Sequence, residues 1–185
     1  MSEKPYHHGN LKNELMEKGL KYVSEHGAES FSMRKLAETC GVSSAAPYAH
    51  FKNKEDYLDQ AREYVTMRFT EILEKAVKDC RDKERLLLEL GKNYVMFFVE
   101  NPHYHGFLFK QGAIDVKKYR PYLMFEQIAG ESLKAMGYDD MTAQNKTIAM
   151  WAMVQGLSDI YMIDSGRSGP VLEQEIEKIL MSVKI

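Results

Sequence analysis

The sequence has few cysteines, no long apolar run and little net charge, and each shortage excludes a class of protein. Its two cysteines, Cys40 and Cys80, lie outside any C-x-x-C spacing, so we expect buried thiols rather than a disulfide or a zinc site. No stretch approaches the roughly 18 consecutive apolar residues that a membrane-spanning helix needs. The opening MSEKPYHHGN lacks the apolar core of a signal peptide, which indicates a cytoplasmic protein.

What is present is the composition of a soluble globular protein, with 44% hydrophobic and 28% charged residues. The formal net charge of −2 conceals an asymmetry: residues 1–54 have more lysine and arginine than acidic residues, whereas residues 55–185 are acidic overall. The first segment also holds four of the six histidines. Taken alone, this small basic excess fits a solvated surface of mixed charge better than it fits an anionic partner.

Apolar residues recur every three or four positions along most of the chain, and no alternating strand pattern is convincing. This periodicity predicts an all-α fold of about nine helices, three short ones followed by a bundle of about six. Residues 103–116 contain glycine and aromatic side chains and are predicted to be irregular. The clearest predicted helices cover about residues 10–25, 33–40, 43–50, 54–81, 84–100, 121–136, 142–165 and 171–183.

Helix-capping residues mark the helix ends in the N-terminal part. Ser32 can accept an otherwise unpaired backbone N–H at the start of the second helix, and Gly41 stands where a left-handed residue would end it. Asn53 can cap the long helix that follows, with Asp56 in the acidic position of a capping box.

Residues 32–50 therefore have the order of a helix-turn-helix: a capped helix, a glycine turn and a second short helix. Small residues at the front of the second helix would let its backbone approach base edges in a major groove roughly 12 Å wide. Pro47 is tolerated only near a helix start, which places that start at Ser43–Ser44. We predict a helix-turn-helix DNA-binding domain over residues 1–54, followed by a helical domain over residues 55–185.

Polar side chains in this region suit both kinds of DNA contact. Serine hydroxyls can hydrogen-bond to base edges, and small apolar side chains can contact thymine methyl groups. Phenol, imidazole and ammonium groups at the end of the second helix suit phosphate oxygens, and the N-terminus of the preceding helix favours anions. The predicted DNA-binding residues are Ser32, Arg34, Ser43, Ser44, Ala46, Pro47, Tyr48, His50, Lys52 and Lys54.

A purely structural interpretation of the same residues stays open. Two short helices joined by Gly-Val-Ser can be ordinary corners of a bundle, and generic helix-turn-helix patterns match many unrelated sequences. Tyr48 and Phe51 can both be core aromatics, an assignment that we favour for Phe51. Tyr48, followed closely by His50 and Lys52, is harder to explain in that way.

The segment FSMRKLAETCGVSSAAPYAHFKNKEDYL closely resembles the N-terminal DNA-binding domain of the tetracycline-repressor (TetR) family. That family shows an apolar–Ser/Thr–x–Arg–x–Ile/Leu–Ala motif, then Gly-Val-Ser, then Tyr-x-His-Phe-x-x-Lys-Glu-x-Leu. The resemblance covers about 50 residues and is highly specific. The matching residues are Phe31, Ser32, Arg34, Leu36, Ala37, Gly41, Val42, Ser43, Tyr48, His50, Phe51, Lys54, Glu55 and Leu58.

Two further strings, Tyr6 to Leu11 and Ala45 to Tyr48, are similar to one TetR subgroup whose C-terminal domain carries a Trp-x-x-x-His-Gly signature. The matching stretch here runs from Trp151 to Gly156, with Gln155 where that subgroup has histidine. A role that depends on the histidine therefore does not transfer to this chain. A role of the glycine in close helix packing does.

The resemblance implies a homodimeric, ligand-responsive transcriptional regulator, usually a repressor, that binds a palindromic operator. Two-fold symmetry would place the recognition helices about 34–36 Å apart, or a multiple of that spacing. A small-molecule effector would release DNA by favouring a different arrangement of the DNA-binding units. By resemblance, phosphates would be contacted by Tyr48, His50 and Lys54, and bases by Ser43, Ser44, Ala46 and Pro47.

Aromatic and methionine side chains are concentrated after residue 81. Methionine is flexible and polarizable and suits adaptable apolar cavities, although such stripes are more often core than pocket. Because bundles of this family commonly enclose an inducer site, we predict an apolar pocket for a hydrophobic or aromatic effector. The predicted ligand-binding residues are Phe97, His103, Tyr104, Phe107, Met124, Phe125 and Trp151.

The last two predicted helices carry apolar residues at three- or four-residue spacing. Buried across a two-fold axis, these stripes would form a four-helix contact; the alternative is that they pack within one chain. The predicted dimer residues are Ala149, Met153, Gly156, Ile160, Ile176, Ile179 and Val183.

Motifs of catalysis or metal binding are lacking. His103 and His105 would share a face on a strand but not on a helix, and no acidic or sulfur ligand lies close to them in sequence. No nucleophile elbow, phosphate loop or carboxylate pair indicates an enzyme, and we expect no cofactor. Two other functions stay open: a helical small-molecule-binding protein without DNA-binding activity, which the intact phosphate-contact residues argue against, and an enzyme built on a helical bundle.

Overall fold

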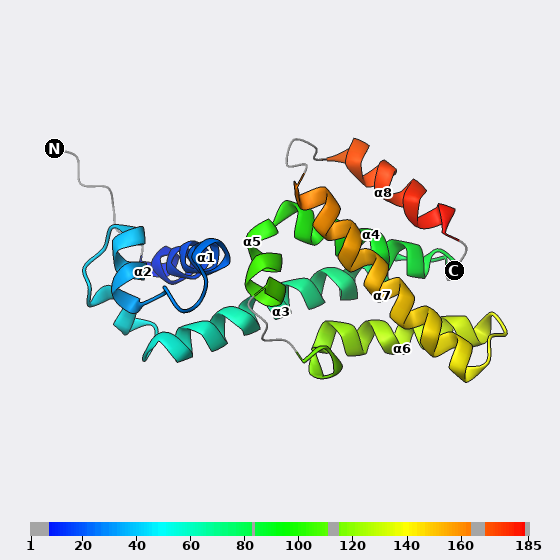
Figure 1. The fold of residues 1–185 in the computed structure, drawn as a ribbon, viewed down its shortest axis with the longest axis horizontal. Helices are drawn as coiled ribbons and strands as arrows, with labels where there is room; N and C mark the ends of the chain where they lie inside the picture. The colour runs from blue at the N-terminus through cyan, green and yellow to red at the C-terminus, as the bar shows by residue number, and fades with distance from the viewer. Residues whose placement is uncertain (1–7, 83, 111–114, 164–168, 184–185) are drawn as a thin grey trace. The chain divides into compact units, whose positions relative to one another are not determined.

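The computed structural model describes residues 8–82, 84–110, 115–163 and 169–183, and within these ranges every regular element is a helix (Figure 1). The all-α prediction is confirmed. In the described residues the chain forms eight α-helices, and three short elements of 3-10 or π geometry lie between them. None of these helices combines the length and the hydrophobicity that a membrane span requires.

The described chain divides into two compact units. Among the described residues, the first consists of 8–65 together with 103–110, and the second of 66–82, 84–102, 115–163 and 169–183. The helix α3, Lys54–Asp79, contributes to both units. The functional domain boundary expected after Lys54 remains a prediction.

The first unit is built on α1, His8–His26, and α2, Met33–Cys40. Its core is centred on Tyr57, whose ring lies 4.9 Å from that of Phe51 and 4.7 Å from that of Phe31, measured between ring centroids. The Tyr57 hydroxyl donates a 2.8 Å hydrogen bond to the backbone carbonyl of Met16. Phe51 is 1% exposed, which confirms its assignment to the core.

Gly19 is the point at which α1 approaches this core most closely. A Cβ atom at this position would lie 2.1 Å from the hydroxyl oxygen of Tyr57 and 3.0 Å from a methyl carbon of Leu36. Any residue with a side chain would therefore displace the central tyrosine. The glycine is required by the close approach and not by its backbone angles.

The chain returns to the first unit after α4, Leu86–Glu100. The segment that we predicted to be irregular is helical here: α5, Pro102–His105, continues directly into a π-helical turn, Gly106–Lys110. This turn packs against α1. A Cβ atom on Gly106 would lie 2.1 Å from Oγ of Ser24, so the glycine permits the close approach.

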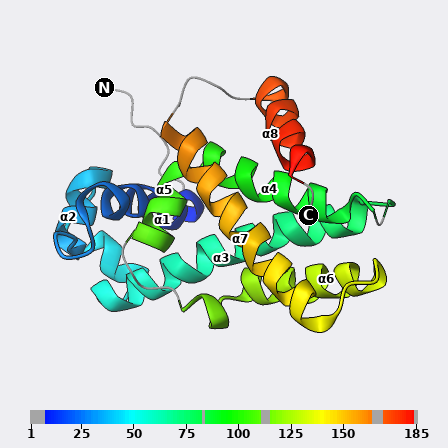
Figure 2. The same ribbon diagram turned by 45° about the vertical axis from the view of Figure 1, so that its right-hand side comes forward.

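In the second unit, α4 packs against both of the last two helices, α7, Asp140–Ile163, and α8, Pro170–Ser182 (Figure 2). The helix α6, Arg120–Ala135, also packs against α7, and a 3-10 turn, Val116–Lys118, precedes it. The core is aromatic, with Trp151 on α7 buried among rings from α4 and α6.

Ion pairs hold α8 to α4 at the edge of this core. Lys92 lies 3.3 Å from a carboxylate oxygen of Glu173, and Arg85 is paired with Glu177. Only 12% of the Lys92 side chain is exposed, and Glu89 neutralises it further at 2.9 Å. Cys40 and Cys80 are free thiols, half-buried and not buried as expected.

Candidate DNA-binding surface

The first helix of the predicted helix-turn-helix begins and ends as its capping residues indicate. Ser32 has an extended backbone, and its hydroxyl accepts a 3.1 Å hydrogen bond from the backbone N–H of Lys35. Gly41 takes the left-handed conformation at φ 68°, which lets the backbone N–H groups of Gly41 and Val42 bond to the last carbonyls of α2. The turn after α2 therefore has the geometry that a helix-turn-helix requires.

The segment that we predicted as a second α-helix over residues 43–50 is a single 3-10 turn, Ala46–Ala49. Its backbone bonds run over three residues, from Tyr48 to Ala45 and from His50 to Pro47. Pro47 has no N–H to donate, and few residues separate it from the start of α3, so a full α-helical ladder does not form. The recognition element is present in the expected place, but it is shorter and tighter than expected.

Three of the residues expected to face DNA are exposed in this segment. Ser43 and Ser44 are exposed, and Tyr48 is 56% exposed although it is aromatic. Ala46 and His50 are half-buried, whereas Pro47 is buried and offers little surface to a base. An exposed phenol beside small hydroxyl-bearing residues favours a contact surface over a core corner for this segment.

The loop after the turn is fixed by side-chain bonds to the start of α3. Asn53 accepts a 2.8 Å hydrogen bond from the backbone N–H of Asp56, as a cap should. The carboxylate of Asp56 accepts a 2.7 Å bond from the backbone N–H of Lys52, one residue earlier than a regular capping box would place it. This backbone bond, supported by a second bond from Gln60, lowers the pKa of Asp56.

The cations of the predicted surface are available for a partner. Lys52 is exposed and Lys54 half-buried at the start of α3. Arg34 is 84% exposed and lies 3.2 Å from Glu38, which Lys35 also approaches. The hydrogen bond from Arg34, with a second from Lys35, lowers the pKa of Glu38, and an exposed pair of this kind contributes little to stability.

Lys12 is a cation near this surface that the sequence did not single out. Its ammonium group lies 5.8 Å from the centre of the Phe51 ring, which places it beside the residues that follow the recognition turn. The helical periodicity of α1 marks Lys12 only as a solvent-facing residue. Its position near Phe51 arises from the packing of α1 against a segment far away in the sequence.

In the first unit, the carboxylate of Glu17 on α1 bonds to residues of two other segments. Oε1 of Glu17 accepts a 2.5 Å hydrogen bond from the hydroxyl of Tyr104 and a 2.7 Å bond from that of Tyr64. Nε2 of His103 lies 3.2 Å from the other carboxylate oxygen. Burial opposes ionisation of Glu17, but the bonds from Tyr104 and the other donors prevail and lower its pKa.

The predicted ligand-binding residues are divided between the two units. His103 and Tyr104 bond to Glu17 in the first unit, where Phe107 is also buried. In the second unit Trp151 lies 5.6 Å from Phe125, measured between ring centroids. The remaining two predicted residues of that unit are Phe97, which is buried, and Met124, which is half-buried.

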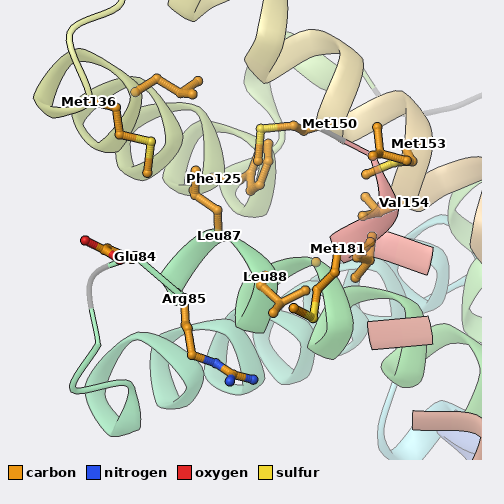
Figure 3. A pocket seen from close by; sticks show the side chains of 14 residues that line it. Glu84, Arg85, Leu87, Leu88, Phe125, Met136, Met150, Met153, Val154 and Met181 are labelled. Atoms are coloured by element: carbon orange, nitrogen blue, oxygen red, sulfur yellow. The ribbon is translucent and has the colours of Figure 1, made fainter. Parts of the chain in front are cut away.

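A cavity of about 300 Å³ lies in the second unit between α4, α6, α7 and α8, as Figure 3 shows. Of the predicted ligand residues it includes only Phe125. The other residues that line the cavity could not be predicted from the sequence. They come from four helices and form no pattern along any one of them. The side chains around it are mostly apolar and include Leu87, Leu88, Met136, Met150, Met153, Val154 and Met181.

The predicted dimer residues on α7 and α8 differ in exposure. Ala149 and Gly156 are exposed and Ile160 is 63% exposed, so one face of α7 is apolar and uncovered within a single chain. A Cβ atom on Gly156 would meet no atom within 4 Å. Ile176 is completely buried in its own chain, which is the intramolecular alternative. Met153 and Ile179 are half-buried, and Val183 is 44% exposed.

The two closely spaced histidines, His103 and His105, contact different residues. His103 is bound to Glu17, and the ring of His105 lies 4.8 Å from that of Phe109. Within the described ranges, no three histidine, cysteine or acidic side chains are grouped as metal ligands would be.

The segment that carries this candidate surface is similar to known proteins. Residues 15–61 fit the model of the bacterial regulatory proteins of the tetR family. This segment is similar to the DNA-binding domain of the TetR family. A curated HTH-type transcriptional regulator of Haemophilus influenzae is 26% identical over 164 residues, which are 84% of this chain and 86% of that protein. The family and this relative are transcription regulators and not enzymes.

Two solved structures illustrate the similarity of the whole fold. A TetR-family transcriptional regulator from Bordetella parapertussis is 15% identical, with a TM-score of 0.75 over 95% of this chain and 96% of that one. AibR, solved in complex with isovaleryl coenzyme A and operator DNA, is 17% identical, with a TM-score of 0.71 over 92% and 95% of the two chains. At these identities the likeness shows the fold alone.

Proposed function

We propose that this protein is a TetR-type repressor that binds a palindromic operator as a homodimer and is released by a small apolar effector. The observation that carries the proposal is the exposed Tyr48 beside Ser43 and Ser44, held at the end of a capped α2. A core corner would bury the phenol. A DNA-contacting turn needs it in solvent, where its hydroxyl can reach a phosphate.

Within this proposal, the roles on DNA follow from side-chain chemistry. Tyr48, His50 and Lys54 contact phosphates, while Ser43 and Ser44 read base edges. The base contacts proposed for Ala46 and Pro47 have less support, because Ala46 is half-buried and Pro47 is buried. The further phosphate contacts come from Ser32, Arg34 and Lys52, and we add Lys12 from its position near Phe51.

The proposed homodimer uses the uncovered face of α7. Ala149, Gly156 and Ile160 lie on one face at helical spacing, and an exposed apolar face on a soluble helix is costly unless a partner covers it. Ile179 and Val183 on α8 would extend the contact. Ile176 would lie beneath this dimer contact and not in it, because this residue is already buried in its own chain.

The proposed effector is apolar, because the cavity between α4, α6, α7 and α8 is lined by methionine, leucine and phenylalanine. The guanidinium of Arg85 points away from Met136 and Met150 in Figure 3. The structure of AibR with isovaleryl coenzyme A and operator DNA supports an apolar acyl group as one candidate class. An aromatic effector fits the same walls, with Phe125 and Trp151 nearby.

The TetR subgroup with the Trp-x-x-x-His-Gly signature is also part of the proposal. Trp151 is buried among rings from α4 and α6, as a core signature residue would be. Gly156 is exposed on α7, where it would allow two α7 helices to approach closely in the dimer.

Selection of binding sites from genomic DNA, followed by fluorescence anisotropy on the recovered sequence, tests the function. We expect tight binding to an inverted repeat, weak binding to a scrambled duplex, and loss of binding when the effector is added. Equal binding to both duplexes would contradict an operator-specific role. A helical ligand-binding protein without DNA-binding activity would bind neither.

A further inference from the structure

One edge of the cavity in the second unit is shared with the proposed dimer surface. Met153 and Val183 line the cavity, and the sequence pattern predicts both of them as dimer residues. In Figure 3, Met153 lies on the opposite side of the cavity from Met136 and Glu84. An effector in the cavity and a second copy of the chain would therefore meet at this edge.

The geometry of α7 explains why the two surfaces adjoin. Successive residues of an α-helix are rotated by about 100°, so Met150 and Val154 share the face that lines the cavity. Ala149 and Gly156 are exposed and lie on the neighbouring face. Met153 falls between the two faces and is half-buried. The cavity wall and the proposed dimer surface are thus adjacent faces of one helix.

The cavity wall on α8 is apolar and largely exposed to solvent within one chain. Leu180 is 7% exposed, but Met181 is 63% exposed and Val183 44% exposed, although all three line the cavity. Ligand sites normally bury roughly 70–90% of a ligand's surface. Because the lining side chains on this side are themselves in contact with water, one chain alone gives an incomplete wall.

Polar contacts hold α8 in place beside this edge. The hydroxyl of Tyr161 on α7 donates a 3.0 Å hydrogen bond to Glu175, and Lys92 on α4 lies 3.3 Å from a carboxylate oxygen of Glu173. Ile176, in the middle of α8, is completely buried. Since α8 is anchored to both α4 and α7, its exposed end is a wall of the cavity and not a lid that is free to close over it.

We propose that the second copy of the chain completes the effector site: it covers the edge formed by Met153, Met181 and Val183, so that the dimer binds an apolar effector more tightly than the monomer does. The gain in affinity comes from apolar surface of the effector that the second copy removes from water. By thermodynamic linkage, the effector strengthens the dimer by the same factor.

This inference rests on the proposed homodimer and its effector-responsive function, and adds that the effector site depends on the dimer. One consequence concerns the release of DNA. The effector would release the operator from an intact dimer, by favouring a different arrangement of the DNA-binding units, and not by separating the two chains.

The test compares a dimer with a monomer of the full chain, using N-phenyl-1-naphthylamine, an uncharged apolar fluorophore that brightens in apolar surroundings. Ile160→Arg supplies the monomer: Ile160 is 63% exposed and is not among the described residues that line the cavity. Fluorescence titration should show that this variant binds the probe about tenfold more weakly than the wild type. A tenfold change is about 1.4 kcal/mol, which covering about 55 Å² of apolar surface provides.

Two further variants control for charge and for the location of the probe. Leu123→Arg also places an arginine at an exposed apolar position, but on α6, outside the proposed dimer surface, and it should stay dimeric and bind like the wild type. Leu87→Trp narrows the cavity and should weaken probe binding, with folding checked by circular dichroism. Unchanged probe binding in Leu87→Trp would overturn the assignment of the site to this cavity.

Sedimentation velocity measures the reciprocal effect. A saturating concentration of the probe should lower the dissociation constant of the wild-type dimer by the same factor of about ten. Equal probe affinity for the wild-type dimer and the Ile160→Arg monomer would overturn the inference. A dimer that the probe dissociates would also overturn it.

The same experiments separate this inference from the function on which it rests. If the wild type is a dimer that binds the selected operator, but the monomer binds the probe equally well, only the inference fails. If the wild type is monomeric, or Ile160→Arg stays dimeric, the proposed dimer surface itself fails. Probe binding to neither form would contradict the apolar effector site.

Discussion

The hydroxyl of Tyr104 donates a 2.5 Å hydrogen bond to Oε1 of Glu17, and so joins the helix that follows α4 to the first helix of the DNA-binding unit. Eighty-seven positions separate the two residues. Tyr64 and His103 complete the set of donors around this carboxylate. The described residues 103–110 are part of the same compact unit as α1 and α2.

Glu17→Gln should destabilise the protein by about 1–2 kcal/mol at pH 7, because an amide N–H₂ would replace an acceptor that faces hydroxyl donors. The loss stays small because 37% of the Glu17 side chain is exposed and solvent screens its interactions. Urea unfolding measures the change. Glu14→Gln is the control, since Glu14 forms only an exposed pair with Lys18, and its effect should be near zero.

The same substitution predicts a pH dependence. The pKa of Glu17 is lower in the folded protein than its ordinary value of 4.5, so its stabilisation is present above that value and is lost as the pH falls through the folded pKa. The stability difference between wild type and Glu17→Gln should be complete at pH 7 and shrink below about pH 4.5. A difference that is independent of pH would show that the carboxylate charge is not what the hydroxyls bind.

Gly19→Ala should destabilise the DNA-binding unit by about 1–3 kcal/mol, because the new methyl group would overlap the Tyr57 hydroxyl at 2.1 Å. Tyr57→Phe in the same chain should recover part of this loss, since it removes the nearest atom. Gly130→Ala on α6 meets no atom within 4 Å and should raise stability by about 0.5–1 kcal/mol through helix propensity. Thermal unfolding of the variants distinguishes crowding from propensity.

Tyr48→Ala should weaken operator binding by about tenfold and by the same factor for all operator variants, because a phosphate contact carries no sequence information. Ser44→Ala should instead change the preferred bases. Tyr138→Ala, an exposed tyrosine of the second unit, is the control and should bind like the wild type. Competition assays against a library of single-base operator variants measure both effects; unchanged affinity in Tyr48→Ala would make the phosphate assignment wrong.

Gly156→Arg should convert the proposed dimer to a monomer at micromolar concentration. The position is open within one chain, so the arginine can be accommodated there and would meet only the second copy. Gly130→Arg, also at a helical glycine with open space, should leave the dimer intact. Sedimentation velocity reads the outcome, and a wild type that is monomeric would remove the basis for the dimer surface on α7.

Local patterns predicted the parts of this structure that depend on neighbouring residues. The bounds of α2, its Ser32 cap and its Gly41 terminus follow from side chains within a few positions of one another. The recognition turn was predicted too long, because the helical pattern over 43–50 does not show that Pro47 and the cap of α3 limit the hydrogen bonds.

Contacts between distant segments could not be predicted in this way. The periodicity of α1 places Glu17 and Lys12 as ordinary polar residues, and their partners lie on elements that only the fold brings near. The helical form of residues 102–110 was missed for the same reason, since it is supported by packing of the π turn against α1. Of the predicted ligand residues, Phe125 alone lines the cavity, which four separate helices enclose.

The salt dependence of operator binding tests the central claim most directly. For the wild type, the logarithm of the affinity for the selected inverted repeat should fall steeply and linearly with the logarithm of salt concentration, by about 0.9 for each phosphate neutralised. Lys54→Met should reduce this slope by about 1 per subunit while preserving the preference for the operator over a scrambled duplex. Affinity that is weak, independent of salt and equal for both duplexes would contradict the account of this surface as a major-groove reader.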